Sequence, residues 1–227
     1  MDKVIQLHYD FYNSINRNLE IRKTLEQENI TILDGFNKNI ELVNRYYQTY
    51  YNNHRNRIVL CGINPGKNGA GKTGIPFIDY KGASYLLSDV HQDEKEQSAQ
   101  FILSIINEIG SETFFNNVYM TNISWFGFIK GGNNFNYYEL PSPLQTTFTK
   151  SFLAEMSFVQ PKVIIPLSKE VELTLKEMMK EGKLNYPVVP RLPHPYYCSI
   201  GKRPIKYKDV YIKKITSLID GNPVYLN

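Results

Sequence analysis

The chain has few of the residues that commonly cross-link a protein or hold a metal ion. Only two of its 227 residues are cysteines, and its four histidines are scattered along the chain. Two cysteines are too few for a disulfide framework or for a four-cysteine cluster, and the histidines lack metal-ligand spacing. We therefore expect neither a metal centre nor a fold held together by disulfides.

The sequence also lacks the features of a membrane or secreted protein. No apolar run reaches the ~18 residues that a membrane-spanning helix needs, and the N-terminus, MDKVIQLHYDFYNSINRN, has no signal-peptide core. The net charge is only +4, with a sequence pI of about 8.8. A mildly basic chain can bind a polyanion, but this charge does not require one. We expect a cytoplasmic protein with no membrane partner.

Apolar patterning predicts one α/β domain over residues 1–227. Residues 2–15 and 36–51 carry apolar side chains at helical spacing, which predicts an N-terminal helical part over 1–52. In the predicted core, 57–220, four short apolar runs alternate with helical segments. This alternation is typical of a central four-stranded, mostly parallel sheet with helices on both faces. The predicted strands are 57–63, 117–123, 162–167 and 186–192, and the predicted helices between and after them are 82–90, 94–109, 143–159, 169–182 and 205–219.

Parallel sheets bind ligands beyond the carboxyl ends of their strands. Three loops follow predicted strands at that edge, after residues 63, 121 and 192. We expect these three loops to form the functional site.

The first of these loops contains GKNGAGKT, 66–73, which matches the phosphate-loop template G-x-x-x-x-G-K-[ST]. A phosphate loop requires a helix that begins at this Gly-Lys-Thr, so that free N–H groups face the phosphates. Here Gly74 and Pro76 follow Thr73 closely, and both disfavour a continuing helix. The other strands also end without an aspartate that could hold Mg²⁺. A nucleotide triphosphatase is kept as an alternative.

The longer span GINPGKNGAGKTGIPF, 62–77, resembles the first motif of the uracil-DNA glycosylase superfamily. It is most similar to the branch of single-strand-selective monofunctional uracil-DNA glycosylases, whose pattern is G-x-N-P-G-x-x-G-x-x-x-T-G-x-P-F. All nine fixed positions are present without a gap. HPYYC, 194–198, resembles the second superfamily motif, and MTNISWFGF between the two resembles the segment that reads uracil. The resemblance covers about residues 57–205 and implies the fold of that superfamily.

The resemblance implies a role for each matching residue. His194 would stabilise the anion that forms as uracil leaves, because a donor aimed at its O2 strengthens as charge develops. Asn64 would position the attacking water. Asn122 would bond the Watson–Crick edge of uracil, since one amide offers both a donor and an acceptor. Phe77 would stack on the flipped base. Plain structural alternatives exist for each: a capping or core-edge position for His194, a turn residue before Pro65 for Asn64, a cap of the following turn for Asn122, and core packing for Phe77.

Two further positions would contact the base, and six would contact DNA. Ile63 would line the base pocket, and Gly66 leaves room near C5, where selective branches carry a tyrosine. The usual sequence after the His-Pro is replaced here by tyrosines, so the strand preference cannot be carried over. The residues expected at the DNA are Gly69, Lys72, Tyr196, Tyr197, Lys202 and Arg203.

The resemblance therefore predicts a base-excision-repair enzyme. It would flip uracil out of single- or double-stranded DNA and hydrolyse its N-glycosidic bond, leaving an abasic site. No cofactor or metal is needed, no lysine is placed for lyase chemistry, and such enzymes act as monomers. A second hypothesis is a superfamily member that recognises uracil or another deaminated base with little or different turnover.

Overall fold

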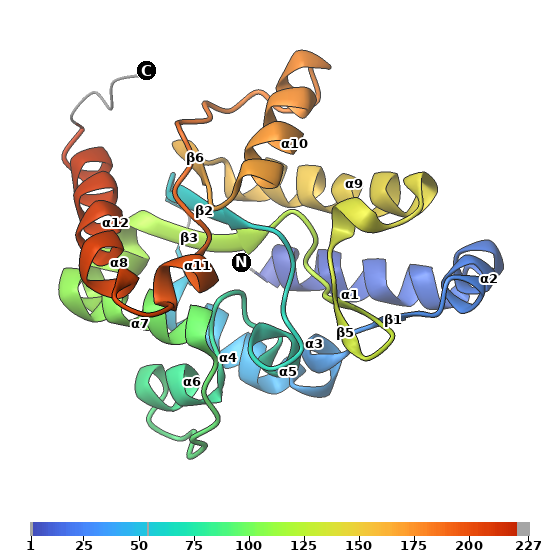
Figure 1. The fold of residues 1–227 in the computed structure, drawn as a ribbon, viewed down its shortest axis with the longest axis horizontal. Coiled ribbons are helices and arrows are strands. Elements are labelled where there is room, and N and C mark those ends of the chain that lie inside the picture. Colours follow the sequence, from blue (N-terminus) through green and yellow to red (C-terminus); the bar gives the residue numbers. More distant parts are fainter. Residues whose placement is uncertain (1, 54, 222–227) are drawn as a thin grey trace.

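The computed structural model describes residues 2–53 and 55–221, and the rest of the predicted domain lies outside them (Figure 1). Residues 2–50 contain four helices and one short strand. They are α1 (Asp2–Arg17), α2 (Leu19–Gln27), β1 (Ile30–Ile32), α3 (Gly35–Lys38) and α4 (Ile40–Tyr50). The central part continues with β2 (Ile58–Gly62), α5 (Ala70–Thr73), α6 (Tyr80–Leu86), α7 (Gln97–Ile109), α8 (Ser111–Asn117) and β3 (Val118–Asn122).

The remainder of the chain begins with a hairpin and ends with the long helix α12. Its elements are β4 (Phe128–Lys130), β5 (Asn133–Phe135), the 3-10 helix η1 (Tyr137–Glu139), α9 (Ser142–Val159), β6 (Val163–Pro166), α10 (Lys169–Lys180), α11 (Pro195–Ser199) and α12 (Arg203–Ile219). The predicted α/β class is confirmed, as is the helical character of the N-terminal part.

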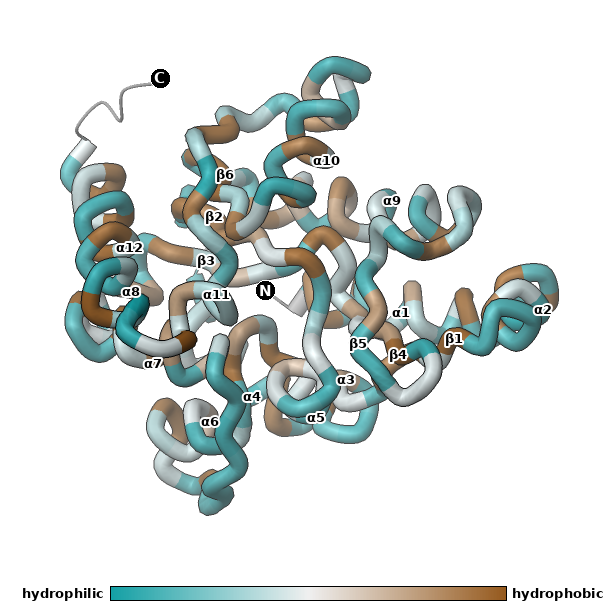
Figure 2. Tube along the Cα trace, viewed as in Figure 1, coloured by the Kyte–Doolittle hydropathy of each residue, from teal (hydrophilic) through white to brown (hydrophobic). Residues whose placement is uncertain are grey.

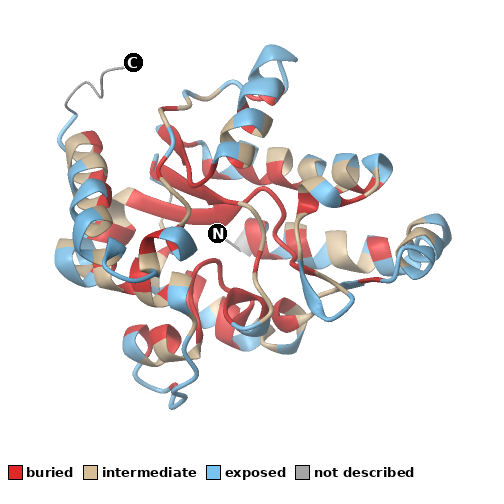
Figure 3. Ribbon diagram, viewed as in Figure 1, coloured by how far each residue is buried: buried red, intermediate tan, exposed pale blue. Residues whose placement is uncertain are grey.

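The central sheet has three parallel strands in the order β3-β2-β6. The register pairs Ile58 with Val118 and with Val163, and it pairs Gly62 with Asn122. Every residue of these three strands is buried, which Figure 3 shows as red arrows at the centre of the molecule. Successive side chains of a strand point to opposite faces, so complete burial means that both faces are covered by helices, as predicted.

The prediction of a fourth parallel strand was wrong in detail. Residues 186–192 run beside β6, where Val188 forms an isolated parallel bridge with Ile164. The N–H groups of Val189 and Leu192 donate to Ile164 and Pro166. Prolines at 187, 190 and 193 interrupt the segment, and a proline cannot donate to a strand ladder. The segment therefore follows the sheet edge without becoming a strand.

A second, antiparallel sheet was not predicted. It has the order β1-β4-β5, and it joins Ile30 of the N-terminal part to Lys130 of the central part. No strand was predicted at residues 30–32 or at 133–135. Three-residue strands carry too little alternation to be recognised in a sequence. The helix α8 was missed as well.

One cluster of buried side chains runs from Val4 of α1 to Leu218 of α12. In Figure 2 the hydrophobic colour gathers on the central strands and on the inward sides of the helices. No helix in the described part of the chain is long and apolar enough to cross a membrane.

The N-terminal helix α1 is fastened to the core by a buried polar cluster. His8 of α1 lies 3.3 Å from the carboxylate of Glu155 on α9, and Tyr119 of β3 donates to the same carboxylate at 2.8 Å. The His8 ring also stacks on Trp125, with centroids 3.8 Å apart. All four side chains are buried. Because Trp125 lies three residues after Asn122, α1 supports the segment that follows β3.

Removal of the Glu155 carboxylate should therefore destabilise the whole fold. We predict that Glu155→Ala lowers the free energy of unfolding by about 3–5 kcal/mol, because it leaves buried polar partners unsatisfied. Urea-induced unfolding measures this loss. Glu177→Ala, a change at an exposed position on α10, is the matched control and should stay within about 0.5 kcal/mol of wild type. Equal effects of the two substitutions would contradict the structural role of the cluster.

Candidate active site

A cleft of about 450 Å³ opens at the carboxyl ends of the parallel strands. The structure brings together there the three segments expected from the sequence: the one after β2, the end of β3, and the one around His194. Its lining residues are Ile63, Asn64, Pro65, Gly66, Asn68, Gly69, Ala70, Phe77, Glu96, Ser98, Ala99, Asn122, Asn134, Asn136, His194 and Tyr196. Six of these were predicted to contact the base or its sugar, and two to contact DNA.

The inner wall of the cleft is formed by Asn122 and Phe77, packed over Gly62. A Cβ atom at Gly62 would overlap both the Asn122 Oδ1 atom and the Phe77 ring. Because the glycine at the end of β2 has no side chain, the amide and the aromatic ring can both pack against the backbone there. Asn122 is only 3% exposed and Phe77 9% exposed. One amide edge, held by the sheet, and one ring packed beside it are groups that can recognise a planar base.

The turn that delivers Phe77 explains several fixed motif positions. The Thr73 hydroxyl donates to the carbonyl of Ile78 at 2.6 Å and accepts the N–H of Ile75 at 3.2 Å. Gly74 ends α5 with φ +78°, and Phe77 itself has φ +61°. A left-handed conformation at a non-glycine residue costs roughly 1–3 kcal/mol and persists only where the surroundings enforce it. The motif therefore builds a strained turn that places the ring.

Asn64 lies in the cleft with its amide bound to the segment after β5. Its Oδ1 accepts the N–H of Tyr137 at 3.0 Å, and its Nδ2 donates to the carbonyls of Phe135 at 3.3 Å and Pro65 at 3.4 Å. These bonds fix the orientation of the amide. One Oδ1 lone pair is left to hold a water.

His194 is held as a neutral donor that faces the cleft. Its Nδ1 accepts the N–H of Tyr196 at 3.1 Å, so the proton of the neutral ring lies on Nε2. Burial lowers the pKa of His194, and the negative charge of Glu96 partly opposes that shift. Pro195 begins α11 directly after it and stiffens the backbone at this point.

Gly66 leaves the cleft open on its side. A Cβ atom at Gly66 would meet only the Asn134 side chain, at 3.5 Å, which is an ordinary contact. Gly69, by contrast, lies tightly against Glu96, where a Cβ would be 3.1 Å from two side-chain carbons. Ile63 lines the cleft between β2 and Asn64.

The structure does not form a phosphate loop from GKNGAGKT. The helix α5 that contains Lys72 has only four residues, and the left-handed Gly74 ends it. A loop that presents free N–H groups to phosphates needs a longer helix that begins there. The Lys72 ammonium instead pairs with Glu94. The structure thus removes the main support for the triphosphatase alternative.

Sequence reasoning missed the wall formed by the start of α7 and by β5. Glu96 and Ser98 line the cleft from α7, and Asn134 and Asn136 line it from β5 and the residue after it. The buried carboxylate of Asp79 holds the start of α7 by accepting the N–H of Glu96 at 2.6 Å. The only sequence signal for this wall is a capping residue before the apolar helix α7. Because such a pattern occurs at the start of many helices, it does not indicate a functional residue.

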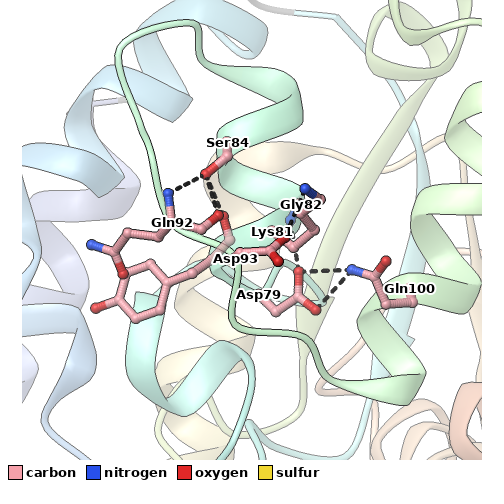
Figure 4. A network of polar contacts seen from close by, with 8 residues as sticks. Asp79, Lys81, Gly82, Ser84, Gln92, Asp93 and Gln100 are labelled. Atoms are coloured by element: carbon pink, nitrogen blue, oxygen red, sulfur yellow. Dashed lines mark hydrogen bonds and ion pairs between the residues drawn. The ribbon is translucent and has the colours of Figure 1, made fainter.

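Figure 4 shows how Asp79 organises the segment before α7. Its carboxylate accepts the N–H of Gly82 at 2.7 Å and the side-chain amide of Gln100 at 2.9 Å. Farther along, the Ser84 hydroxyl donates to the carbonyl of Gln92 at 2.7 Å. The segment 79–96, which contains α6 and the loop after it, is therefore held in a defined conformation up to the cleft-lining Glu96.

Of the residues expected at the DNA, Gly69 and Tyr196 line the cleft, and Tyr197, Lys202 and Arg203 follow Tyr196 on α11 and at the start of α12. Residues 194–203 were interpreted as a loop, but 195–199 form the short helix α11, with proline at its first position. Tyr196 and Tyr197 are exposed on it, and the Arg203 guanidinium lies 3.9 Å from the centre of the Tyr197 ring. Lys202 is exposed beside them. These side chains form an aromatic and basic rim.

Within the described ranges, 2–53 and 55–221, no group of three or more histidine, cysteine or acidic side chains is arranged to hold a metal ion. Both cysteines are free and buried.

Comparisons with known proteins identify the family. The sequence model of the uracil DNA glycosylase superfamily matches residues 49–216. A solved structure titled as wild-type Pedobacter heparinus SMUG2 superposes with a TM-score of 0.73 at 27% sequence identity, over 84% of this chain and 89% of that chain. No curated protein sequence matches the chain. The chain belongs to the uracil-DNA glycosylase superfamily and resembles its SMUG branch. It is therefore a glycosylase-type hydrolase that acts on DNA.

The strained turn generates a stability prediction. We expect Gly74→Ala to lower the free energy of unfolding by about 3 kcal/mol, because the new Cβ would overlap Phe36 and would require a left-handed alanine. Gly131→Ala is the matched control: its φ is also positive, at +56°, but nothing lies within 4 Å of its Cβ position. That variant should lose only about 1 kcal/mol. Chemical unfolding compares the two, and equal losses would show that the turn is not tightly packed.

Proposed function

We propose that this protein is a monofunctional uracil-DNA glycosylase. It flips uracil out of DNA into the cleft, hydrolyses the bond between C1′ and N1, and leaves an abasic site in an intact strand. The observation that carries this proposal is the meeting of Asn122, Phe77 and His194 in one cleft. An amide edge, an aromatic wall and a neutral N–H donor together match the edge, the face and the O2 of uracil.

Base recognition follows from the inner wall. Asn122 presents a donor to uracil O4 and an acceptor to uracil N3–H. Cytosine offers the opposite pattern at these two positions and would leave a buried amide unsatisfied, which is a strong basis for rejection. The Phe77 ring supplies the stacking surface for the flipped base.

The chemical step separates charge. As the C1′–N1 bond breaks, the bonding pair leaves with uracil and the sugar becomes an oxocarbenium cation. The His194 Nε2–H points a hydrogen bond at O2, where negative charge grows, and this bond is stronger in the transition state than in the ground state. A water held near Asn64 then adds to C1′, and its proton is lost to the base or to solvent.

The absence of a placed lysine supports hydrolysis without strand cleavage. No lysine is found among the cleft-lining residues of the described chain. A lyase would need such an amine to form a Schiff base with the sugar. Outside the cleft, the tyrosine and arginine rim on α11 and α12 is suited to stack on bases and to contact phosphates.

The open space at Gly66 favours a related activity on uracils that carry a small C5 substituent. Because no side chain blocks the C5 side of the base at this position, 5-hydroxymethyluracil should also be released. Thymine selectivity must then come from elsewhere in the cleft. If the protein released uracil but released no C5-substituted uracil, the proposed activity on such bases would be contradicted.

Loss of the Nε2–H donor should slow base release strongly. We predict that His194→Ala lowers the single-turnover rate of uracil release by about 100- to 1,000-fold, as expected for the loss of an anion-stabilising donor. Binding of an uncleavable abasic analogue should change much less. The measurement is base release from a labelled oligonucleotide that carries one uracil. A rate equal to that of wild type would contradict the role of His194.

The neutral state of His194 generates a pH prediction. Burial lowers its pKa below the ordinary value of about 6.5, so more than half of the rings are still neutral at about pH 6.5. Base release should therefore fall on acidification with a midpoint below about pH 6.5, where protonation removes the Nδ1 acceptor from Tyr196. Single-turnover rates across pH test this. A midpoint above about pH 6.5 would mean that the pKa is raised instead.

A further inference from the structure

The cleft contains one charged side chain that the proposed chemistry has not used. Among the lining residues of the described chain, only Glu96 carries a formal charge. A carboxylate in a cleft that receives DNA repels the phosphates, so it weakens binding of the substrate. This cost must be offset by a contribution of the carboxylate to the fold or to the reaction.

The carboxylate of Glu96 is held in place on several sides. Its Oε2 accepts the N–H of Ala99 at 2.9 Å, and its Oε1 accepts the hydroxyl of Ser98 at 3.0 Å. Its own N–H is bound by the buried Asp79 at 2.6 Å. Gly69 lets the side chain lie against the opposite loop, since any larger residue there would press on its carbons. Both carboxylate oxygens keep a free lone pair.

No other group in the cleft supplies negative charge. Asn64, which follows β2, is a neutral amide, and its oxygen and nitrogen are already bonded to the backbone of Tyr137, Phe135 and Pro65. It can hold a water, but it cannot stabilise a cation electrostatically as a carboxylate would. The sugar nevertheless gains a full positive charge in a dissociative step.

We propose that the Glu96 carboxylate stabilises the oxocarbenium sugar during base release. This inference rests on the proposed glycosylase function and adds a catalytic residue to it. The carboxylate repels the anionic substrate in the ground state and attracts the cationic sugar in the transition state, which is differential binding in favour of the transition state. His194 stabilises the departing uracil anion, and Glu96 stabilises the sugar cation that remains.

A plain structural role predicts a different behaviour. Glu96 is the capping residue of α7, and a cap requires only an acceptor, which a glutamine provides as well. Glu96→Gln therefore keeps the shape of the side chain and an acceptor for Ala99, and it removes the charge. Glu112→Gln is the matched control, because it removes the same charge from an exposed position in the first turn of α8, outside the cleft lining.

The first experiment compares two uncleavable abasic analogues placed in the same oligonucleotide. One has a cationic pyrrolidine ring in place of the sugar, and the other has a neutral tetrahydrofuran ring. Wild type and Glu112→Gln should bind the cationic analogue about tenfold more tightly than the neutral one. In Glu96→Gln this preference should disappear, while binding of the neutral analogue should become equal or tighter because a repulsion is lost.

The second experiment measures single-turnover release of uracil at about pH 8. Loss of Glu96 lowers the pKa of His194 further, so His194 stays neutral in both proteins and cannot account for a difference. Glu96→Gln should release uracil about 100-fold more slowly than wild type, and Glu112→Gln should match wild type.

The outcomes separate the two proposals. An unchanged preference for the cationic analogue in Glu96→Gln overturns the role of Glu96. A loss of stability together with an equal loss of affinity for both analogues also overturns it, because that result shows that Glu96 acts only as the cap of α7. If wild type releases no uracil but Glu96→Gln still loses the preference, the proposed function fails while recognition of a cation at Glu96 stands. Uracil release at equal rates by both proteins overturns only the role of Glu96.

Discussion

The cleft depends on the missing side chain of Gly62. The parallel register places this glycine opposite Asn122 at the end of the central strand, and both the Asn122 amide and the Phe77 ring occupy the space that a Cβ atom would fill. The sheet sets the position of the amide, and the strained turn after α5 sets the position of the ring. His194 arrives from the segment along β6. The recognition elements thus come from three separate segments whose relative position is fixed by one sheet.

The parts of the site that could be predicted are those encoded by local chemistry. Continuous apolar runs marked β2, β3 and β6 because buried parallel strands carry apolar residues on both faces. Glycine, threonine and proline in 62–77 matched fixed positions of a superfamily motif, and the structure shows what two of them do: Thr73 bonds both sides of a turn and Gly74 supplies its left-handed residue. The match to a superfamily motif therefore reflected real backbone requirements.

The remaining features depend on contacts distant in sequence. The sheet β1-β4-β5 joins residues about 100 positions apart through strands of three residues, which leave no periodic signal. Glu96 reaches the cleft only because Asp79 anchors the start of α7, and nothing in the neighbouring sequence distinguishes it from an ordinary cap. The helix α11 was missed for a related reason, since it is a single short turn stabilised by its proline start. In each case the local sequence is compatible with more than one structure, and tertiary packing selects the one that forms.

The arrangement of charge in the cleft suits a reaction that separates charge. The neutral His194 donor, the fixed Glu96 carboxylate and the buried Asn122 amide all line the same cleft. The N-terminal helix α1 contributes at a distance, because His8 stacks on Trp125 just beyond Asn122. The helical extension is therefore part of the support of the site.

The most direct test of the account is identification of the products that wild-type protein forms from an oligonucleotide containing a single uracil. We expect free uracil and an unbroken strand that carries an abasic site, which alkali then cleaves. The absence of free uracil with enzyme in large excess, from both single- and double-stranded DNA, would contradict the central claim.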